Sequence, residues 1–202
     1  MFVTFEGIEG SGKSTLLSSL AGILRQRGRD VVTTREPGGT PVGTAVREIF
    51  LDRSSEIAPV AEAFLVNAAR AQHVADVIRP ALHRGAVVLC DRYTDSTLAY
   101  QGYGRGFDLA ALGRLCEIAS AGLQPDLTIL LDVPVPESRR RLEARGGRAD
   151  RMEAEGAGFH ERVRAGYLKI AAGDPRYLVL DGLLLPADLV ALALARLAMN
   201  AP

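Results

Sequence analysis

The chain has 202 residues, a length that suits one domain, or one domain with a small lid, and that can bury a sizeable core. Lysine and arginine together number 24 and aspartate and glutamate also number 24, so no basic excess indicates a nucleic-acid partner. No apolar run is long enough to cross a membrane, no signal segment begins the chain, and two cysteines make no disulfide framework, so we expect a cytoplasmic protein.

Short apolar runs alternate with helical patterns along the whole chain. The runs are typical of strands buried on both faces of a sheet, and they are FVTFE (2–6), VVTTR (31–35), AVVLCD (86–91), LTILLDV (127–133) and YLVLD (177–181). The helical patterns cover 14–28, 59–82, 108–122, 136–145, 159–173 and 186–199. Because strand and helix alternate five times, we expect an α/β fold: a single domain over 1–202 with a five-stranded parallel sheet and helices on both faces.

One segment departs from this pattern. RGGRADRMEAEGAG (145–158) is rich in glycine and charge and poor in large apolar residues, so we expect a mobile surface loop. Arg145, Arg148 and Arg151 recur every three residues, and one helical turn would align them on one side.

The turn after the first strand, FEGIEGSGKST (5–15), fits the pattern G-x-x-x-x-G-K-[ST]. Its glycines let backbone N–H groups turn toward phosphate oxygens, and the next helix directs its positive end at them. Lys13 is one of only two lysines in an arginine-rich chain, and a compact ammonium suits the outer phosphates. A chance glycine-rich turn is the alternative, which the flanking strand and helix disfavour. We therefore expect a nucleotide's phosphates to be held by Gly7, Ile8, Glu9, Gly10, Ser11, Gly12, Lys13, Ser14 and Thr15.

A phosphate loop does not name the reaction. A GTPase would carry Asn-Lys-x-Asp, but neither Asn67 nor Asn200 precedes a lysine, and the Leu-Ser-Gly-Gly-Gln signature of transporter-type ATPases is absent. A small kinase with two substrates remains. TREPGGT (34–40) and DRYTDSTLAYQGYGRG (91–106) both follow strands, at the sheet edge where such folds bind ligands.

Two side chains are suited to a magnesium ion that accompanies the nucleotide. Ser14 offers its hydroxyl, and Asp91 places a carboxylate at the end of an apolar strand. The alternative for Asp91 is a cap on the following helix. His73, His83 and His160 lack metal-ligand spacing, and we assign them no role.

These segments together resemble the thymidylate kinase family, which phosphorylates thymidine monophosphate with ATP. FEGIEGSGKST, TREPGGT, AARAQH, DRYTDSTLAYQG and RGGRADRME occur in the family's order over nearly the whole chain. The resemblance implies a P-loop nucleoside monophosphate kinase fold, Mg²⁺ with ATP, and a homodimer, with apolar helix faces such as 59–82 at its interface. The lid over 145–158 resembles that of the bacterial type, which implies catalytic arginines there, since Ile8 and Ser11 leave the phosphate loop without charge at those positions.

The resemblance also implies residue roles in the acceptor site. Arg92 and Arg35 bind the phosphate of the monophosphate, and Glu9 faces the sugar 3′-hydroxyl or a bound metal. Tyr100 crowds the 2′ position and so favours deoxyribose. Plainer alternatives are a surface ion pair for Arg92, a solvated carboxylate for Glu9 and packing at the core edge for Tyr100.

Further implied roles concern the two bases and the lid. Arg70 reads the thymine carbonyl edge, and Thr97 and Gln101 share a helical face with Tyr100 in the acceptor pocket. The family commonly places a stacking phenylalanine one turn before Arg70, but this chain has Val66 there, and Phe64 lies on another face. The remaining assignments place Arg141 over adenine. They also make Arg151, and after it Arg148, the catalytic arginines of the lid, which act together with Lys13 and Arg92.

Two alternatives stay open. One is a kinase for another nucleoside, deoxynucleoside or nucleoside monophosphate. The other is a nucleotide-gated binding protein with no acceptor, which the DRYTDSTLAYQG segment disfavours.

Overall fold

The computed structural model describes residues 1–199, in which five parallel strands form one sheet. The order across the sheet is β2-β3-β1-β4-β5, and the strands are β1 (Phe2–Glu6), β2 (Val31–Arg35), β3 (Val87–Asp91), β4 (Leu127–Asp132) and β5 (Tyr177–Asp181). The predicted sheet is confirmed. β3 begins one residue later, and β4 ends one residue earlier, than the sequence indicated.

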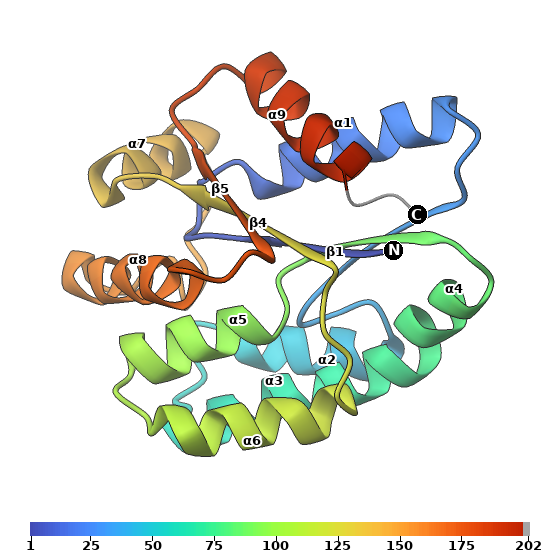
Figure 1. Cartoon of the computed structure of the whole chain (residues 1–202). Helices are drawn as coiled ribbons and strands as arrows, with labels where there is room; N and C mark the ends of the chain where they lie inside the picture. The colour runs from blue at the N-terminus through green and yellow to red at the C-terminus, as the bar shows by residue number, and fades with distance from the viewer. Residues whose placement is uncertain (200–202) are drawn as a thin grey trace.

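Helices cover both faces of this sheet (Figure 1). They are α1 (Lys13–Gln26), α2 (Pro41–Leu51), α3 (Pro59–His73), α4 (Arg79–His83), α5 (Thr94–Thr97), α6 (Leu109–Ser120), α7 (Val135–Arg145), α8 (Ala157–Ala171) and α9 (Pro186–Met199). Two π-helical stretches, Val74–Ile78 and Leu98–Gly104, follow α3 and α5. α1 and α9 lie together on one side of the sheet, and α2 to α6 lie on the other (Figure 1).

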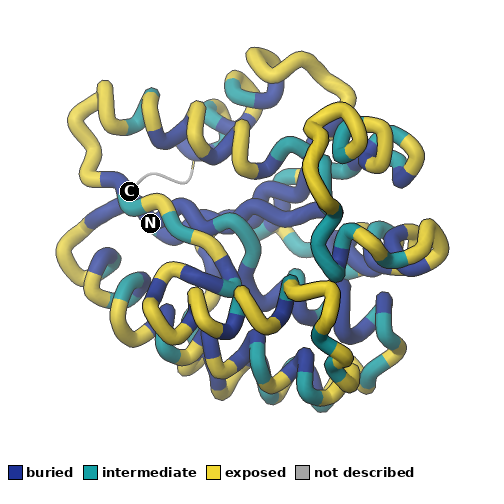
Figure 2. The backbone as a smooth tube through the Cα atoms, turned by 180° about the vertical axis from the view of Figure 1, so that it is seen from behind, coloured by how far each residue is buried: buried dark blue, intermediate teal, exposed yellow. Residues whose placement is uncertain are grey.

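Side chains that alternate along a strand enter different hydrophobic clusters. Val3 and Phe5 pack with α1 and α9, whereas Phe2 packs with Tyr93 and the π-helical stretch 74–78 on the opposite side. Because both faces are covered, the inner strands β1, β3 and β4 are buried at nearly every position, whereas the edge strands β2 and β5 are partly exposed. Figure 2 accordingly shows buried backbone through the centre and exposed backbone on the outer turns.

The interval between β2 and α3 holds a helix that the sequence analysis did not predict. α2 begins after Thr40, whose side chain accepts a hydrogen bond from the N–H of Gly43, and Pro41 occupies its first position. A Cβ at Gly43 would lie 2.3 Å from the carbonyl oxygen of Gly38, so only glycine fits.

The long helix expected over 59–82 is present, but it is not α-helical throughout. Residues 74–78 are π-helical between α3 and α4. Pro80 explains the change, because it has no N–H to donate and its ring displaces the carbonyl of Asp76, four residues earlier.

The expected loop over 145–158 is shorter and better packed than predicted. α7 ends at Arg145 and α8 begins at Ala157, and Met152 is buried in a hydrophobic cluster with α8. Asp150 Oδ1 accepts the N–H of Glu153, and Glu153 Oε2 accepts the N–H of Asp150. This reciprocal pair is a capping box, and it stabilises the turn over 151–155.

The predicted alignment of the lid arginines is wrong. Gly146 and Gly147 both adopt positive φ, 71° and 89°, and end helical geometry directly after Arg145. Arg148 and Arg151 therefore lie outside α7 and share no helical face with Arg145.

None of the helices within residues 1–199 combines the length and hydropathy that a membrane span requires.

Candidate active site

The turn between β1 and α1 wraps around the ammonium group of Lys13. Its Nζ donates to the carbonyl oxygens of Gly7 at 3.0 Å and Ile8 at 2.8 Å. Gly7 has φ 135°, and a Cβ there would lie 2.5 Å from the carbonyl oxygen of Leu131, so β4 leaves room only for glycine. Burial, reinforced by the nearby Arg92, lowers the pKa of Lys13 to about 8. An anion beside this ammonium would stabilise its charge.

A hydroxyl and a carboxylate meet at the mouth of this loop. Ser14 Oγ donates to Asp91 Oδ2 at 2.7 Å, which joins the first turn of α1 to the end of β3. Oxygen donors of this kind suit Mg²⁺. The alternative role for Asp91 is wrong, because α5 begins only at Thr94 and has no side-chain cap.

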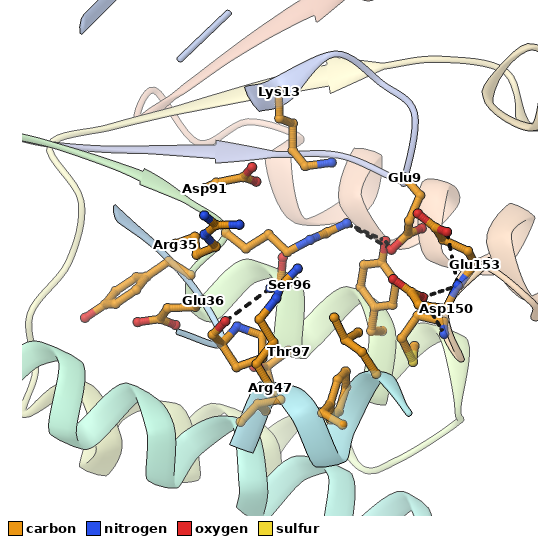
Figure 3. A pocket seen from close by; sticks show the side chains of 18 of the residues that line it. Glu9, Lys13, Arg35, Glu36, Arg47, Asp91, Ser96, Thr97, Asp150 and Glu153 are labelled. Carbon is orange, nitrogen blue, oxygen red and sulfur yellow. Dashed lines mark hydrogen bonds and ion pairs between the residues drawn. The ribbon is translucent and has the colours of Figure 1, made fainter. Parts of the chain in front are cut away.

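A cavity of about 220 Å³ opens beside the loop. In Figure 3, Lys13 and Asp91 lie at one end and Arg47 of α2 lies at the other. Eleven of the predicted site residues line it: Glu9, Gly10, Lys13, Ser14, Arg35, Arg70, Asp91, Arg92, Thr97, Tyr100 and Gln101.

Arg92 occupies the centre of the site and has an unusual backbone. Its φ is 75°, a left-handed conformation that costs about 1–2 kcal/mol for a residue with a Cβ. The guanidinium donates to Glu9 Oε1 and to the hydroxyls of Tyr100 and Tyr167, each at 3.0 Å. These bonds offset the strain and hold the cation against the phosphate loop.

Glu6 supports Arg92 from the sheet. Its Oε1 accepts the N–H of Tyr93 at 2.7 Å, and its Oε2 accepts the hydroxyls of Ser96 and Tyr167 at 2.6 and 2.9 Å. Those two hydroxyls also accept hydrogen bonds from Arg92. Burial and the charge of Asp95 raise the pKa of Glu6 to about 7, although Ser96 and Arg92 oppose the shift.

The raised pKa of Glu6 leads us to expect that the free energy of unfolding depends on pH. The ordinary pKa of 4.5 applies to the unfolded chain, so the folded state binds the proton of Glu6 more tightly between pH 4.5 and about 7. The free energy of unfolding should therefore fall by about 2–3 kcal/mol from about pH 5 to about pH 8 through this group alone. Urea unfolding of the parent and of Glu6→Gln at both pH values measures it. Equal pH slopes for the two proteins would contradict the assignment.

Glu9 points one carboxylate oxygen at Arg92 and leaves the other without a hydrogen bond. Oε1 accepts from Arg92 and from the hydroxyl of Tyr100, at 3.0 and 2.7 Å. Oε2 is buried and accepts no hydrogen bond from residues 1–199, and His160 Nδ1 lies 3.5 Å away. Burial favours the neutral acid, but Arg92 and Lys13 outweigh it and lower the pKa of Glu9. His160 could not be predicted as a neighbour of Glu9, because α8 is far from the phosphate loop along the chain.

Three arginines face one another around the cavity. The side chain of Arg35 makes no hydrogen bond or ion pair within residues 1–199, and Arg47 Nη1 donates to the carbonyl of Pro37 at 3.2 Å. Burial and the charges of Arg35 and Arg92 lower the pKa of Arg47. Cations that repel one another in this way mark a site for an anion. Arg47 was not predicted as a site residue, because the helix that carries it, α2, was not predicted either.

Arg70 is buried, and its guanidinium is fully engaged. Nε donates to Glu36 at 2.8 Å, Nη1 to Asn67 and Cys116, and Nη2 to the carbonyl of Tyr93 and to Thr97. All five N–H groups thus have protein acceptors. Its role in reading thymine stays a prediction. A hydrogen bond to the base would require one of these N–H groups to donate to the base as well as to its protein acceptor.

An aromatic ring reaches the pocket from α2. Val66 lines the cavity where the family places a phenylalanine, and Phe50 lines it beside Val66 in the same hydrophobic cluster. The guanidinium of Arg151 lies 4.9 Å from the centre of the Phe50 ring. Phe50 thus supplies an apolar ring to the wall that Val66 leaves without one.

Three predicted arginines lie outside the cavity lining. Arg151 Nη1 donates to Glu62 Oε1 at 2.5 Å and its Nε to the carbonyl of Phe50, whereas Arg148 is exposed. Arg141 donates to the carbonyl oxygens of Gly182 and Gly10 at 2.9 and 3.4 Å, against the outside of the phosphate loop. The predicted contact of Arg141 with adenine stays a prediction.

One further group has metal-binding geometry. Potential ligand atoms of Glu36, His73 and Cys90 lie within 4.8 Å of one another. Glu36 is already neutralised by Arg70, and His73 bridges Glu36 and Thr34 through its two ring nitrogens. Glu36, which His73 also holds, thus anchors Arg70.

One cavity joins a phosphate loop and its adjacent Ser–Asp pair to a region lined by arginines. This arrangement defines a P-loop nucleoside monophosphate kinase, which holds a phosphate donor and a phosphate acceptor side by side.

Comparison with known proteins narrows the class. Residues 5–191 match the thymidylate kinase family model. Thymidylate kinases of Geobacter sulfurreducens and Pseudomonas putida are 53% and 55% identical to this chain, each aligned over 90% of this chain and 88% of the relative. The crystal structure of thymidylate kinase from Ehrlichia chaffeensis matches with TM-score 0.79 and 33% identity, over 98% of both chains. The chain belongs to the thymidylate kinase family.

Proposed function

We propose that the chain transfers the γ-phosphate of ATP to thymidine monophosphate, giving thymidine diphosphate for dTTP synthesis. The observation that carries the proposal is the continuity of one cavity, from Lys13 and the Ser14–Asp91 pair to the arginines that face one another. The names of the relatives support thymidine monophosphate as the acceptor and give the alternative acceptors no support.

The chemistry follows from positioning and charge. The loop and Lys13 hold the outer phosphates of ATP, and Arg35, Arg47 and Arg92 hold the acceptor phosphate. Ser14 and Asp91 would hold Mg²⁺, which when bound neutralises charge on the donor phosphates. The acceptor oxygen is already ionised, so no general base is required. The lid excludes water, which suppresses hydrolysis of ATP.

Glu9 and Tyr100 are proposed to bind the acceptor sugar. The buried Oε2 of Glu9 lacks a hydrogen-bond donor among the described residues, and a sugar hydroxyl would supply one. The ring of Tyr100 packs edge-on against Phe159 and Tyr167, 6.0 and 6.2 Å between ring centres, which fixes its place beside the sugar.

An acceptor panel tests the proposed function. Purified protein with ATP and Mg²⁺ is offered thymidine, thymidine monophosphate and the monophosphates of uridine, cytidine and guanosine. We expect thymidine monophosphate to give the highest kcat/KM. A preference for a nucleoside or another monophosphate would contradict the proposal, and ATP binding without any transfer would favour a nucleotide-gated binding protein.

Replacement of Tyr100 tests the sugar assignment. Tyr100→Phe keeps the ring and loses only the hydroxyl bonds to Glu9 and Arg92, so the preference for deoxyribose should persist with a lower rate. Tyr100→Ala should accept the ribonucleotide better relative to the deoxyribonucleotide. Ratios of kcat/KM for the two sugars measure this, and an unchanged ratio in Tyr100→Ala returns the residue to a packing role.

A homodimer is also proposed, through the outer face of α2 and α3. Ile49 of α2 and Val60 and Phe64 of α3 are 50%, 45% and 60% exposed, although they are large and apolar. Sedimentation of the parent and of Phe64→Glu tests it, with a shift to monomer expected for the variant. The proposed cytoplasmic location and the single domain over 1–202 stay predictions.

A further inference from the structure

Glu62 is the most completely buried carboxylate among the lid contacts. It lies in the first turn of α3 with 0% exposure. Its Oε1 accepts from Arg151 of the lid and from Arg105, and its Oε2 accepts from Arg105 and from the amide Nε2 of Gln101 at 3.1 Å. Burial favours the neutral acid, but the hydrogen bonds from Arg105 and Arg151 outweigh it and lower the pKa of Glu62. The carboxylate is therefore ionised.

An ionised carboxylate fixes the orientation of the amide beside it. A carboxylate only accepts hydrogen bonds, so the atom of Gln101 that faces it must be the NH₂ group. The reverse orientation would place the carbonyl oxygen of Gln101 against a negative oxygen at the same distance. The carbonyl oxygen Oε1 then lies on the side of the amide away from Glu62, and Gln101 is one of the residues that line the cavity.

Arg70, beside Gln101, offers the cavity no free hydrogen-bond donor, because all five of its N–H groups have protein partners. Gln101 Oε1 accepts no hydrogen bond from residues 1–199, although the residue is only 2% exposed. It is thus available to accept a hydrogen bond from a ligand in the cavity. A hydrogen-bond acceptor such as Gln101 Oε1 favours a base that offers a donor. Thymine and uracil carry N3–H, whereas cytosine has a lone pair at N3.

We propose that Glu62 is a positioning residue that holds the Gln101 carbonyl toward the acceptor base and thereby selects pyrimidines that carry N3–H over cytosine. The inference rests on the proposed function, since it requires that the acceptor base lies against Gln101. Arg151 and Arg105 maintain the charge of Glu62, so the lid contributes to base selection from a distance.

The test compares deoxyuridine and deoxycytidine monophosphates, whose bases differ at N3 and at the adjacent C4 substituent. In Glu62→Gln the new amide can donate as well as accept, so the side-chain amide of Gln101 can rotate and exchange the positions of its carbonyl and NH₂ groups. We expect the parent to prefer the uracil acceptor by at least about 10²-fold in kcat/KM, and the variant to narrow this ratio about tenfold or more. The KM for ATP should not change.

Glu155→Gln is the matched control. Glu155 also forms an ion pair with Arg105, at 2.6 Å, but Gln101 donates to Glu62 and not to Glu155. This variant should keep the parental ratio of the two acceptors. If Glu62→Gln does not fold, Glu62→Asp keeps the charge for both arginines while withdrawing the carboxylate from Gln101, and it should narrow the ratio in the same direction.

The parental ratio in a folded Glu62→Gln or Glu62→Asp protein would overturn the inference. Calorimetric binding separates this result from a failure of the proposed function, because it needs no turnover. A parent that binds the uracil monophosphate more tightly than the cytosine one, with the difference lost in the Glu62 variant, supports the role of Glu62 even without phosphoryl transfer. Equal binding of the two by the parent contradicts it.

Discussion

Lys13→Met should lower the rate of phosphoryl transfer by about 10²–10³-fold or more, because it removes the preorganised cation from the donor phosphates. Methionine keeps the length and apolar character of the stem. What it loses in the structure are the hydrogen bonds from Nζ to the carbonyls of Gly7 and Ile8 and to Ser11 Oγ. The fold should survive, and Lys13→Ala should behave in the same way.

The chain provides a matched control for this result. Its only other lysine, Lys169, is exposed on α8, with Nζ 5.5 Å from the centre of the Tyr103 ring. Lys169→Met removes the same charge and should leave turnover unchanged. Steady-state kinetics and thermal unfolding of both variants make the measurement. A folded Lys13→Met protein with near-parental turnover would falsify the phosphate-loop assignment.

The second large effect is expected in the lid. An arginine placed at the transferring phosphate is worth about 10³–10⁵ in rate in related phosphoryl-transfer sites, and the loop itself carries only Lys13. The sequence favoured Arg151 first and Arg148 second. In the structure, Arg151 is tied to Glu62 and Phe50, whereas Arg148 is exposed and forms no ion pair within residues 1–199. We therefore expect Arg148→Ala to lower kcat most.

The kinetic signature separates catalysis from binding. Loss of a group that acts in the transition state lowers kcat far more than it raises the KM for thymidine monophosphate. Arg140→Ala is the control, since Arg140 is an exposed residue of α7 paired with Glu137. If Arg145→Ala, Arg148→Ala and Arg151→Ala each keep at least half of the parental turnover, the lid is only a cover. The positive charge must then come from Arg35 or Arg92.

Features that depend on neighbouring residues were predictable from the sequence. Strands buried on both faces leave continuous apolar runs, so Val88 and Leu89 are both buried although they face opposite sides. The phosphate loop is likewise local, because its glycines and Lys13 lie within eight residues. α2 carried a usable signal in Thr40 and Pro41, but Gly43 in its first turn lowers helix propensity and concealed it.

Contacts between distant segments could not be read from the sequence. Glu62 and Arg151 are 89 positions apart, and nothing in the lid composition indicates that its arginine pairs with the first turn of α3. The same holds for Tyr167 of α8, which hydrogen-bonds to Arg92, 75 positions earlier. Such partners are set by the packing of α8 and the lid on the acceptor side. The residues predicted for the acceptor pocket do line the cavity, but their partners from α2 and α8 could not be predicted.

The most direct test of the account follows one phosphate. Protein is mixed with ATP labelled in its γ-phosphate, Mg²⁺ and thymidine monophosphate, and the nucleotides are separated at early times. The account predicts label in thymidine diphosphate, formed in step with ADP, and its loss in Lys13→Met but not in Lys169→Met. Label that appears only as inorganic phosphate, with no thymidine diphosphate, would contradict it.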